Sequence, residues 1–446
     1  MIFTRLARSS RPSSALAMAL VLAATGTLAA TALEQPAHAQ KKKKKKDAEQ
    51  AQTEYSNEFI EAYNAANEAF SAEGADYEAV RALLPPVIAV ANSGDEKNAI
   101  GQLQYNLALE LDDDALKLSG LEMMRDSGKL ETSRAGAVNY ALYQSYRDAG
   151  NIAAARASLE RAIAVNYTVE AVRADGTPTT IGPDQLTRLI SDLYFEQDQY
   201  AEGVAFLGEQ IEARKAAGQP VPELWIRSGL SYAYNNDVRG EVNRFLGWLV
   251  EDYPSDVVWG DAVVFTLNSN EFSRQESVDL FRLARRIGKY NDARVLSEYV
   301  EVLDPIKYPG EVVAVVKQGR SLGVLDGSDT FIEDSYRQAE GRIATDRAEL
   351  VNAARDAGKP SADLKTLVLA GDLFLSYDQP ADAEGYYARA LGMSGVETPV
   401  VLTRLGIAQY DQGKYAEAIE TFKKVDGARR DIANLWAVYA AQKSGL

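Results

Sequence analysis

The chain has 446 residues and a formal net charge of −16, from 64 acidic and 48 basic side chains. It contains no cysteine and a single histidine, His38, so disulfides, thiol nucleophiles and thiolate metal sites are excluded. An excess of negative charge of this size also disfavours nucleic acid as a partner.

Residues 1–39 have the pattern of a cleavable secretory signal peptide. Three arginines precede an Ala- and Leu-rich run over residues 15–33, and the segment ends on Ala37-His38-Ala39. Small residues at those positions are typical of signal peptidase sites, so we expect cleavage between Ala39 and Gln40. The alternative is an uncleaved membrane anchor. Cleavage predicts a chain exported from a bacterium to the periplasm, without its only histidine.

A lysine-rich tail, residues 40–51, follows the predicted cleavage site. Its run Lys41–Lys46 places six positive charges directly after the apolar segment, which opposes translocation under the positive-inside rule. The run suits contact with an anionic membrane or cell-wall polymer. The other interpretation is a disordered terminus that serves only solubility.

Residues 52–303 show apolar side chains at helical spacing and are predicted to form an array of helix pairs. The first pair covers residues 52–84, and Pro85-Pro86 is expected to interrupt its second helix. A second pair is expected over residues 98–124. The acidic run 112–114 between its helices lacks the alternating ligands of a calcium loop, so we interpret it as helix capping.

A third pair is predicted over residues 139–163, and the helical period then breaks. Residues 168–172 and 177–181 alternate on either side of Asp175-Gly176, a dipeptide typical of β-hairpin turns. The sequence therefore predicts a small hairpin inserted near 168–181, between helix pairs. Further pairs follow over residues 187–211 and 225–254, and a weaker periodicity continues beyond them.

Residues 304–329 contain Asp304-Pro305 and Pro309-Gly310, which predict breaks, and we expect a flexible seam or linker here. Thr330 and Glu333 have the spacing of a capping box, so a helix is predicted from residue 330 toward Ala357. Residues 330–446 are then expected to form a second array that ends in a capping helix over residues 431–443.

The clearest pattern is Pro399–Val425. Leu405-Gly406 lies on a first helix, Gly413 lies in the turn, and Ala418 with Phe422 lies on a second helix, the small residues being placed where the helices would cross. This order resembles the tetratricopeptide repeat (TPR). The resemblance implies an all-α, right-handed superhelical solenoid of helix-turn-helix repeats, and a related pattern begins 35 residues earlier.

In the family that this chain resembles, the first helix of each repeat lines a groove that holds a peptide or a protein segment. Carrying those positions over gives a mixed set of polar and aromatic candidates for a partner-binding groove: Tyr140, Gln144, Arg147, Arg188, Asp192, Phe195, Ile226, Leu230, Tyr234, Val368, Asp372, Thr403 and Tyr410. Each aromatic residue among them has the alternative of being packed between repeats.

These features favour a non-catalytic scaffold in the cell envelope that binds a protein or peptide, with no metal, cofactor or nucleic acid. Neither a phosphate-binding GxxxxGK[ST] nor a dinucleotide-binding GxGxxG motif occurs. One alternative is a tethering module that holds an anionic surface through its lysine tail. Another is a solenoid enzyme that cleaves wall glycan through paired carboxylates, a chemistry that the composition leaves open.

Overall fold

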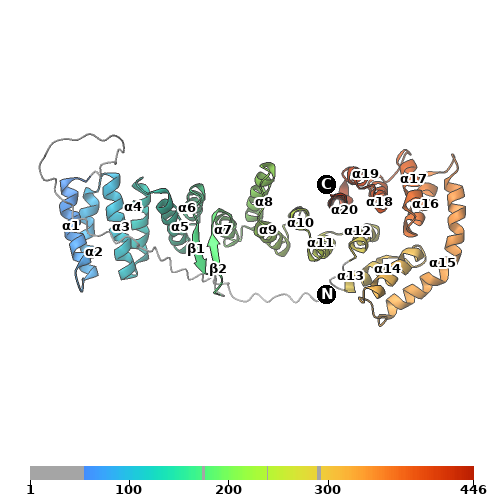
Figure 1. Cartoon of the computed structure of the whole chain (residues 1–446), viewed down its shortest axis with the longest axis horizontal. Coiled ribbons are helices and arrows are strands. Elements are labelled where there is room, and N and C mark those ends of the chain that lie inside the picture. Colours follow the sequence, from blue (N-terminus) through green and yellow to red (C-terminus); the bar gives the residue numbers. More distant parts are fainter. Residues whose placement is uncertain (1–54, 173–175, 239, 289–292, 446) are drawn as a thin grey trace, which may run out of the picture. The chain divides into compact units, whose positions relative to one another are not determined.

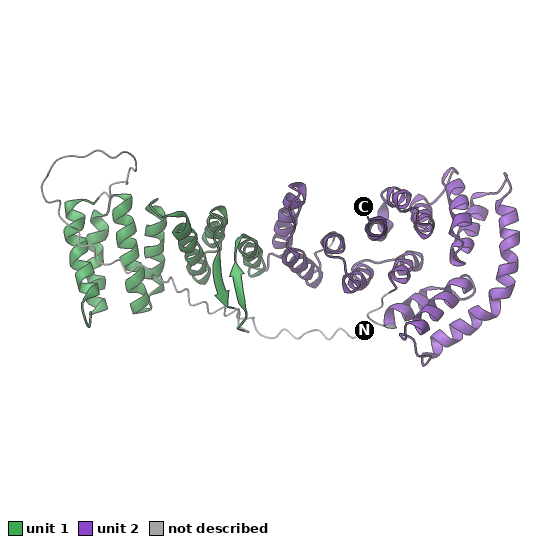
Figure 2. Ribbon diagram, in the orientation of Figure 1, with its two compact units in different colours: residues 1–197 green, residues 198–446 purple. Residues whose placement is uncertain are grey.

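The structure is a computed structural model that describes residues 55–172, 176–238, 240–288 and 293–445. These residues form α-helices joined by short turns and a single two-stranded sheet, and the chain divides into two compact units, residues 1–197 and 198–446 (Figures 1 and 2). The all-α prediction is confirmed. The predicted cleavage site, the lysine tail and Asp175 lie outside the described residues.

Unit 1 consists of consecutive antiparallel helices, each packed against its neighbours in the chain. Its elements are α1 (Asn57–Ser71), α2 (Tyr77–Val90), α3 (Gly94–Leu111), α4 (Asp114–Asp126), α5 (Thr132–Asp148), α6 (Ile152–Ala164), β1 (Val169–Val172), β2 (Pro178–Ile181) and α7 (Pro183–Phe195).

Helix α2 continues through Pro85 and Pro86, so the predicted interruption is wrong. The two prolines lie on the solvent face of the helix, where the residues one turn earlier, Arg81 and Ala82, are exposed. Proline has no N–H to donate to the carbonyl oxygen four residues earlier, but here water can donate to the carbonyl oxygens of Arg81 and Ala82. The helix therefore continues without burying an unsatisfied group.

The acidic run caps helices, as its sequence indicates. Asp112 ends α3 in the left-handed conformation, with a φ of 52°. Asp113 begins α4 by accepting a hydrogen bond from the backbone N–H of Leu116 at 2.9 Å. The run is thus used by the backbone on both sides of a tight turn.

The predicted β-hairpin is present between α6 and α7. Strands β1 and β2 are antiparallel, with Val169 opposite Ile181 and Val172 opposite Pro178. Gly176 in the connection has a φ of 84°, a conformation that favours glycine. Tyr167, which precedes β1, and Ile181, at the end of β2, are both buried. The open end of the hairpin is therefore fixed to the helices.

The described secondary-structure elements of unit 2 are all helices. Its elements are α8 (Tyr200–Ala216), α9 (Glu223–Asn235), α10 (Glu241–Asp252), α11 (Asp256–Ser269), α12 (Arg274–Ile287), α13 (Ala293–Val302), α14 (Pro309–Ser321), α15 (Thr330–Ala357), α16 (Leu364–Ser376), α17 (Pro380–Leu391), α18 (Thr398–Asp411), α19 (Tyr415–Phe422), the 3₁₀ turn η1 (Gly427–Arg429) and α20 (Arg430–Ser444).

The glycine of the repeat pattern lies under an aromatic ring of the second helix. A Cβ atom built on Gly406 would come within 2.5 Å of the Phe422 ring, and one on Gly371 within 2.5 Å of the Tyr387 ring. Cβ atoms in proteins essentially never approach another heavy atom within 3.0 Å, so only glycine leaves room for these rings. The close helix crossing predicted from the pattern at Pro399–Val425 is therefore observed.

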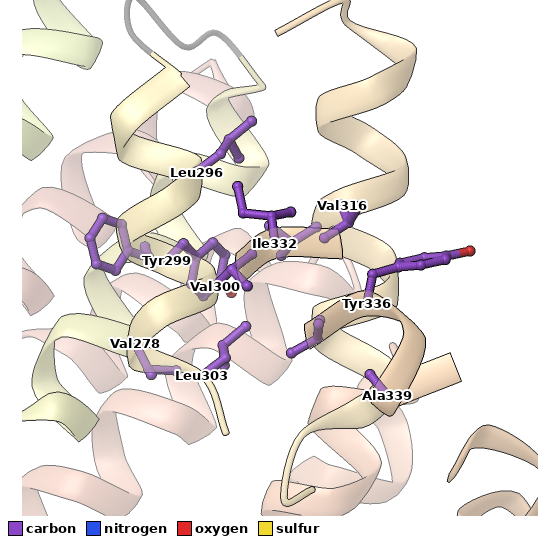
Figure 3. Packing of buried hydrophobic residues seen from close by; sticks show 12 residues of the cluster. Val278, Leu296, Tyr299, Val300, Leu303, Val316, Ile332, Tyr336 and Ala339 are labelled. Carbon is purple, nitrogen blue, oxygen red and sulfur yellow. The ribbon is translucent and has the colours of Figure 1, made fainter. Parts of the chain in front are cut away.

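Residues 304–329, which we expected to form a seam, contain helix α14. Its residues Val312, Val315 and Val316 are fully buried in a core that also includes side chains of α12, α13 and α15 (Figure 3). The division into compact units falls instead between Gln197 and Asp198. Helix α15 begins at Thr330, as predicted, but Asp329 rather than Thr330 is its N-cap.

Helix α20 packs on helices from the first half of its unit as well as on its neighbours in the chain. It packs against α10 and α12 as well as α18 and α19 (Figure 1). Trp259 Nε1 donates to Gln442 Oε1 at 3.0 Å, and Gln442 Nε2 donates to the carbonyl oxygen of Val250 at 2.5 Å. The predicted capping helix therefore covers the last repeat and also joins it to helices more than 150 residues earlier.

Candidate partner-binding faces

A face of unit 1 carries charged side chains of α5 and α7, which are joined by an ion pair between Arg147 and Glu196. At the end of α5, the guanidinium of Arg147 donates to both carboxylate oxygens of Glu196, at 3.0 and 2.6 Å. On α7, Arg188 donates to Asp192 at 2.6 Å, one turn further along the helix. About a third of each arginine side chain is exposed, 35% for Arg147 and 30% for Arg188, so a partner can reach both.

Asp192 is the least compensated charge of this face. Burial raises the pKa of its carboxyl, the neighbouring Glu196 raises it further, and Arg188 and Arg147 only partly offset these effects. A cation brought to this position by a partner would stabilise the carboxylate. The face thus offers two arginines for recognising acidic groups and one carboxylate whose charge is incompletely balanced.

Aromatic side chains lie beneath these charges and belong to the core. Tyr140 and Phe195 are buried, and the Tyr140 ring lies 5.7 Å from that of Tyr143 and 5.8 Å from that of Tyr167. Burial also raises the pKa of Tyr143. Of the six groove candidates in unit 1, Gln144, Arg147, Arg188 and Asp192 therefore keep accessible surface, whereas Tyr140 and Phe195 pack between helices.

Most of the groove candidates in unit 2 are also packing residues. Tyr234 and Val368 are half-buried, and Tyr234 packs edge to face against Phe265 with ring centroids 4.7 Å apart. The fully or largely buried ones are Ile226, Leu230, Thr403 and Tyr410. Aromatic and apolar residues at groove positions cannot be told from core residues by spacing alone, because both face a neighbouring helix.

Asp372 is the charged candidate of unit 2, and its two partners belong to the same chain. Its carboxylate accepts two bonds from Arg404 Nη1, at 2.8 and 2.7 Å, and one from the Tyr387 hydroxyl at 2.7 Å. Arg404 is almost fully buried and lies within 3.6 Å of Asp279 on α12. The face of α16 and α18 is thus in contact with helix α12.

Helix α12 carries charged side chains that are buried rather than solvated. Arg282 donates from Nε and Nη2 to Glu311 on α14, at 2.8 and 2.7 Å, and from Nη1 to Asp279 at 2.9 Å. Asp279 also accepts from Arg429 of η1. All of these side chains are at most 4% exposed. The contacts connect α12, α14, α18 and η1.

Two more arginines of α12 extend the contact to the far ends of α16 and α18. Arg285 donates to both carboxylate oxygens of Asp378, at 3.1 and 2.8 Å, and Arg286 donates to both of Asp411, at 3.0 and 2.5 Å. Two-point pairing of this kind fixes the orientation of both partners. Helix α12 is therefore held on the α16/α18 face as a bound helix would be.

The buried pairs are ionised. Burial alone would raise the pKa of Glu311, but Arg282 and the Tyr299 hydroxyl outweigh it and lower the pKa to about 2. Burial would likewise raise the pKa of Asp279, and its neighbours Arg404, Arg429 and Arg282 lower it instead. Each charge is therefore compensated by a close opposite charge.

Sequence reasoning missed this network because α12 reads as an ordinary amphipathic helix. Its apolar side chains, among them Val278 and Phe281, pack in the core with α13, α14 and α15, as expected. Its charged face would ordinarily be assigned to solvent. The available signal was the arginine spacing at 282, 285 and 286, with Asp279 one turn earlier, which places the four charges along one side of the helix.

A shallow pocket lies between the ends of α8 and α10. It is lined by Lys215, residues 219–221 and residues 251–253. Lys215 already pairs with Glu251 and Asp252, at 2.9 and 2.8 Å, and the Tyr253 hydroxyl donates to the Val221 carbonyl oxygen. Lys215 and Tyr253 are therefore already paired with other groups that line this pocket.

Within the described residues, no group of three or more histidine, cysteine or acidic side chains is arranged to hold a metal ion. Likewise, no described helix is long and apolar enough to cross a membrane.

The glycine-on-aromatic crossings, the antiparallel helix pairs and the terminal capping helix define a TPR-like helical repeat protein. No family model and no curated protein matches the sequence.

Solved structures that are similar to this chain include TPR proteins. The TPR domain of P58(IPK) has 13% identity and a TM-score of 0.23, and the match covers 78% of this chain and 98% of that one. A tetratricopeptide repeat protein from Parabacteroides merdae has 10% identity and a TM-score of 0.25, covering 70% and 99%. Both TM-scores are below 0.5, so the assignment to the class rests on the helix packing described above.

Proposed function

We propose that this chain is a non-catalytic scaffold that binds a segment of a partner protein on the α5/α7 face of unit 1. The observation that carries the proposal is the cluster of Arg147 on α5, Arg188 and Asp192 on α7, and Glu196 at the end of α7. These side chains pair with each other, yet each keeps solvent-accessible surface. These side chains can replace their present ion pairs with pairs to charged groups of a partner, and this requires little reorganisation.

Unit 2 supports the proposal by supplying an internal example. Arg285 and Arg286 of α12 pair with Asp378 and Asp411 at the ends of α16 and α18, and Asp279 of α12 lies 3.6 Å from Arg404 of α18. A repeat face of this chain can thus hold a helix by the chemistry that the α5/α7 face presents. In unit 1, the packing contacts with three or more residue pairs that involve α5 or α7 run to adjacent elements of the chain, so we assign this face to an external partner.

The cell-envelope setting is part of the proposal and rests on residues 1–39, whose charge and apolar pattern favours export to the periplasm. Amino-terminal sequencing of the protein purified from its native host is expected to begin at Gln40. A chain that begins at Met1 would remove the periplasmic assignment and leave the binding face unaffected.

The experiment is an affinity capture from envelope extract with the chain from Gln40 as bait, and bound proteins identified by mass spectrometry. A double charge reversal, Arg147→Glu with Asp192→Lys, changes the face while the aromatic residues beneath it stay in place. Glu160→Lys, an exposed position on α6, is the control for a change of surface charge.

We expect a discrete partner that the wild type and the Glu160→Lys control retain and that the double variant loses. Equal recovery on the double variant would overturn the assignment of this face. A fourth bait lacks Lys41–Lys46. A partner that is lost from this bait and retained by the double variant would assign binding to the lysine tail.

A further inference from the structure

The outer edge of β1 pairs with no other strand among the described residues. Within the described residues, no backbone hydrogen bond joins β1 to any segment other than β2. In an antiparallel strand every second residue directs its N–H and C=O away from its partner. Half of the backbone groups of Val169–Val172 therefore point outward along an open edge.

The two edges of this sheet differ in how well they can accept a third strand. Strand β2 begins with Pro178, which has no N–H to donate, and β2 also contacts α7. Strand β1, Val-Glu-Ala-Val, contains neither proline nor lysine, the residues that commonly block edge strands. The receptive edge is therefore that of β1.

The side chains of β1 determine which strand would fit. Glu170 and Val172 lie on the same, exposed face, and 60% of the Val172 surface is accessible. Val169 and Ala171 are half-buried on the other face. An incoming strand would place one residue opposite Glu170 and another, two positions away, opposite Val172. A basic residue at the first position and an apolar one at the second are complementary.

A second copy of this chain fits the same edge poorly. An antiparallel pairing of two β1 strands with matching faces sets Glu170 either against Glu170 of the other copy or against its Val172. The first arrangement opposes two like charges and the second sets a carboxylate against an apolar side chain. The chemistry of the edge thus selects a different chain.

We infer that the outer edge of β1 binds an extended segment of a partner protein by strand addition, with Lys or Arg opposite Glu170 and an apolar residue opposite Val172. The hairpin gains from this, because a two-stranded sheet is marginal on its own and a third strand supplies a ladder of hydrogen bonds. This surface is separate from the charged face of α5 and α7, and its occupation does not depend on that face.

The test uses a terminally blocked, fluorescently labelled peptide Thr-Val-Thr-Lys-Thr-Val-Thr with the whole chain from Gln40. The peptide is symmetric about its lysine, so either strand direction can place the lysine opposite Glu170 and a valine opposite Val172. One control peptide carries Glu in place of Lys. Another carries proline at both central threonines, which removes backbone donors.

Binding by fluorescence anisotropy is compared among the wild type, Glu170→Lys and the exposed control Glu160→Lys. We expect the lysine peptide to bind the wild type and Glu160→Lys equally and Glu170→Lys about fivefold more weakly, with Glu170→Lys preferring the glutamate peptide. The proline peptide is expected not to bind. Hydrogen exchange is expected to slow at residues 169–172 when the lysine peptide is added.

Unchanged preference in Glu170→Lys, binding of the proline peptide, protection outside β1 or no binding of the lysine peptide to the wild type would each overturn the inference. Should Glu170→Lys unfold the hairpin, Glu170→Gln removes the charge at similar size and is expected to abolish the preference for lysine. The Arg147→Glu/Asp192→Lys variant is expected to bind the peptide normally, so a failure here and a failure of the α5/α7 face are distinguishable.

Discussion

Replacing Glu311 by glutamine tests whether the buried charge network holds unit 2 together. In the wild type its carboxylate accepts two bonds from Arg282 and one from the Tyr299 hydroxyl, and both charged side chains are 2% exposed. Glutamine keeps one acceptor oxygen and turns an NH₂ group toward a donor. Arg282 then remains buried with an incomplete set of partners.

Breaking one side of a buried ion pair costs about 3–5 kcal/mol, because the remaining charge stays desolvated. We expect Glu311→Gln to lower the stability of unit 2 by that amount. The double variant Arg282→Met/Glu311→Leu is expected to cost less than Glu311→Gln alone, since it removes both charges at once. An exposed pair provides the control: Arg337→Gln, whose partner is Asp334, is expected to cost at most about 1 kcal/mol.

Urea unfolding followed by tryptophan fluorescence suits this measurement. All four tryptophans, Trp225, Trp248, Trp259 and Trp436, lie in unit 2, so the signal reports that unit alone. A loss below about 1 kcal/mol for Glu311→Gln, or a double variant less stable than the single one, would refute the reasoning.

Two further predictions follow from contacts described above. Gly406→Leu is expected to cost about 1–3 kcal/mol or more, because its side chain must displace the Phe422 ring, whereas Gly385→Ala, where nothing lies within 4 Å, should leave the melting temperature nearly unchanged; equal melting temperatures would contradict the packing. The pKa of Glu311 is lowered from 4.5 to about 2, so its contribution is complete above the unfolded-state value and is lost as the pH falls from about 4.5 toward 2. Tryptophan-monitored stability should therefore decline over that range, and less steeply in Arg282→Met/Glu311→Leu; identical slopes would speak against it.

The predictable parts of the fold are those in which a local steric, backbone or hydrogen-bonding requirement is met by one residue type. Gly406 is required because Phe422 lies on it, and Gly176 adopts a positive φ in the hairpin connection. Asp113 caps a helix through a bond three residues away. Such relations leave a signature within a few residues, so they can be read from the sequence.

The failures share a different cause, since each depends on what packs against an element from far along the chain. Pro85 and Pro86 are tolerated because that side of α2 faces water, and α14 forms in a region of breaking residues because its valines enter a core supplied by three other helices. Spacing identifies which side of a helix a residue occupies. It does not indicate whether that side meets solvent or another helix.

For the same reason, the sequence could not distinguish accessible groove candidates from buried ones. Gln144, Arg147, Arg188 and Asp192 were placed on first helices by position, and the structure leaves them accessible, with the two arginines engaged in ion pairs. Tyr140, Phe195, Thr403 and Tyr410 occupy equivalent positions and are buried. The arginines of α12 were not considered at all, because their partners Glu311, Asp378 and Asp411 are 29 to 125 residues away.

The return of α20 to α10 and α12 affects how unit 2 is made and how it can evolve. A linear repeat array can gain or lose a repeat at its end and can begin to fold while the remainder is still being synthesised. In unit 2, Trp259 of α11 bonds to Gln442 and Asp279 of α12 bonds to Arg429, so these contacts can form only after residues 429–442 have been synthesised. A deletion or duplication of one helix pair between α12 and α20 would displace α20 from α10 and α12, so we expect the number of helix pairs in that interval to be constrained.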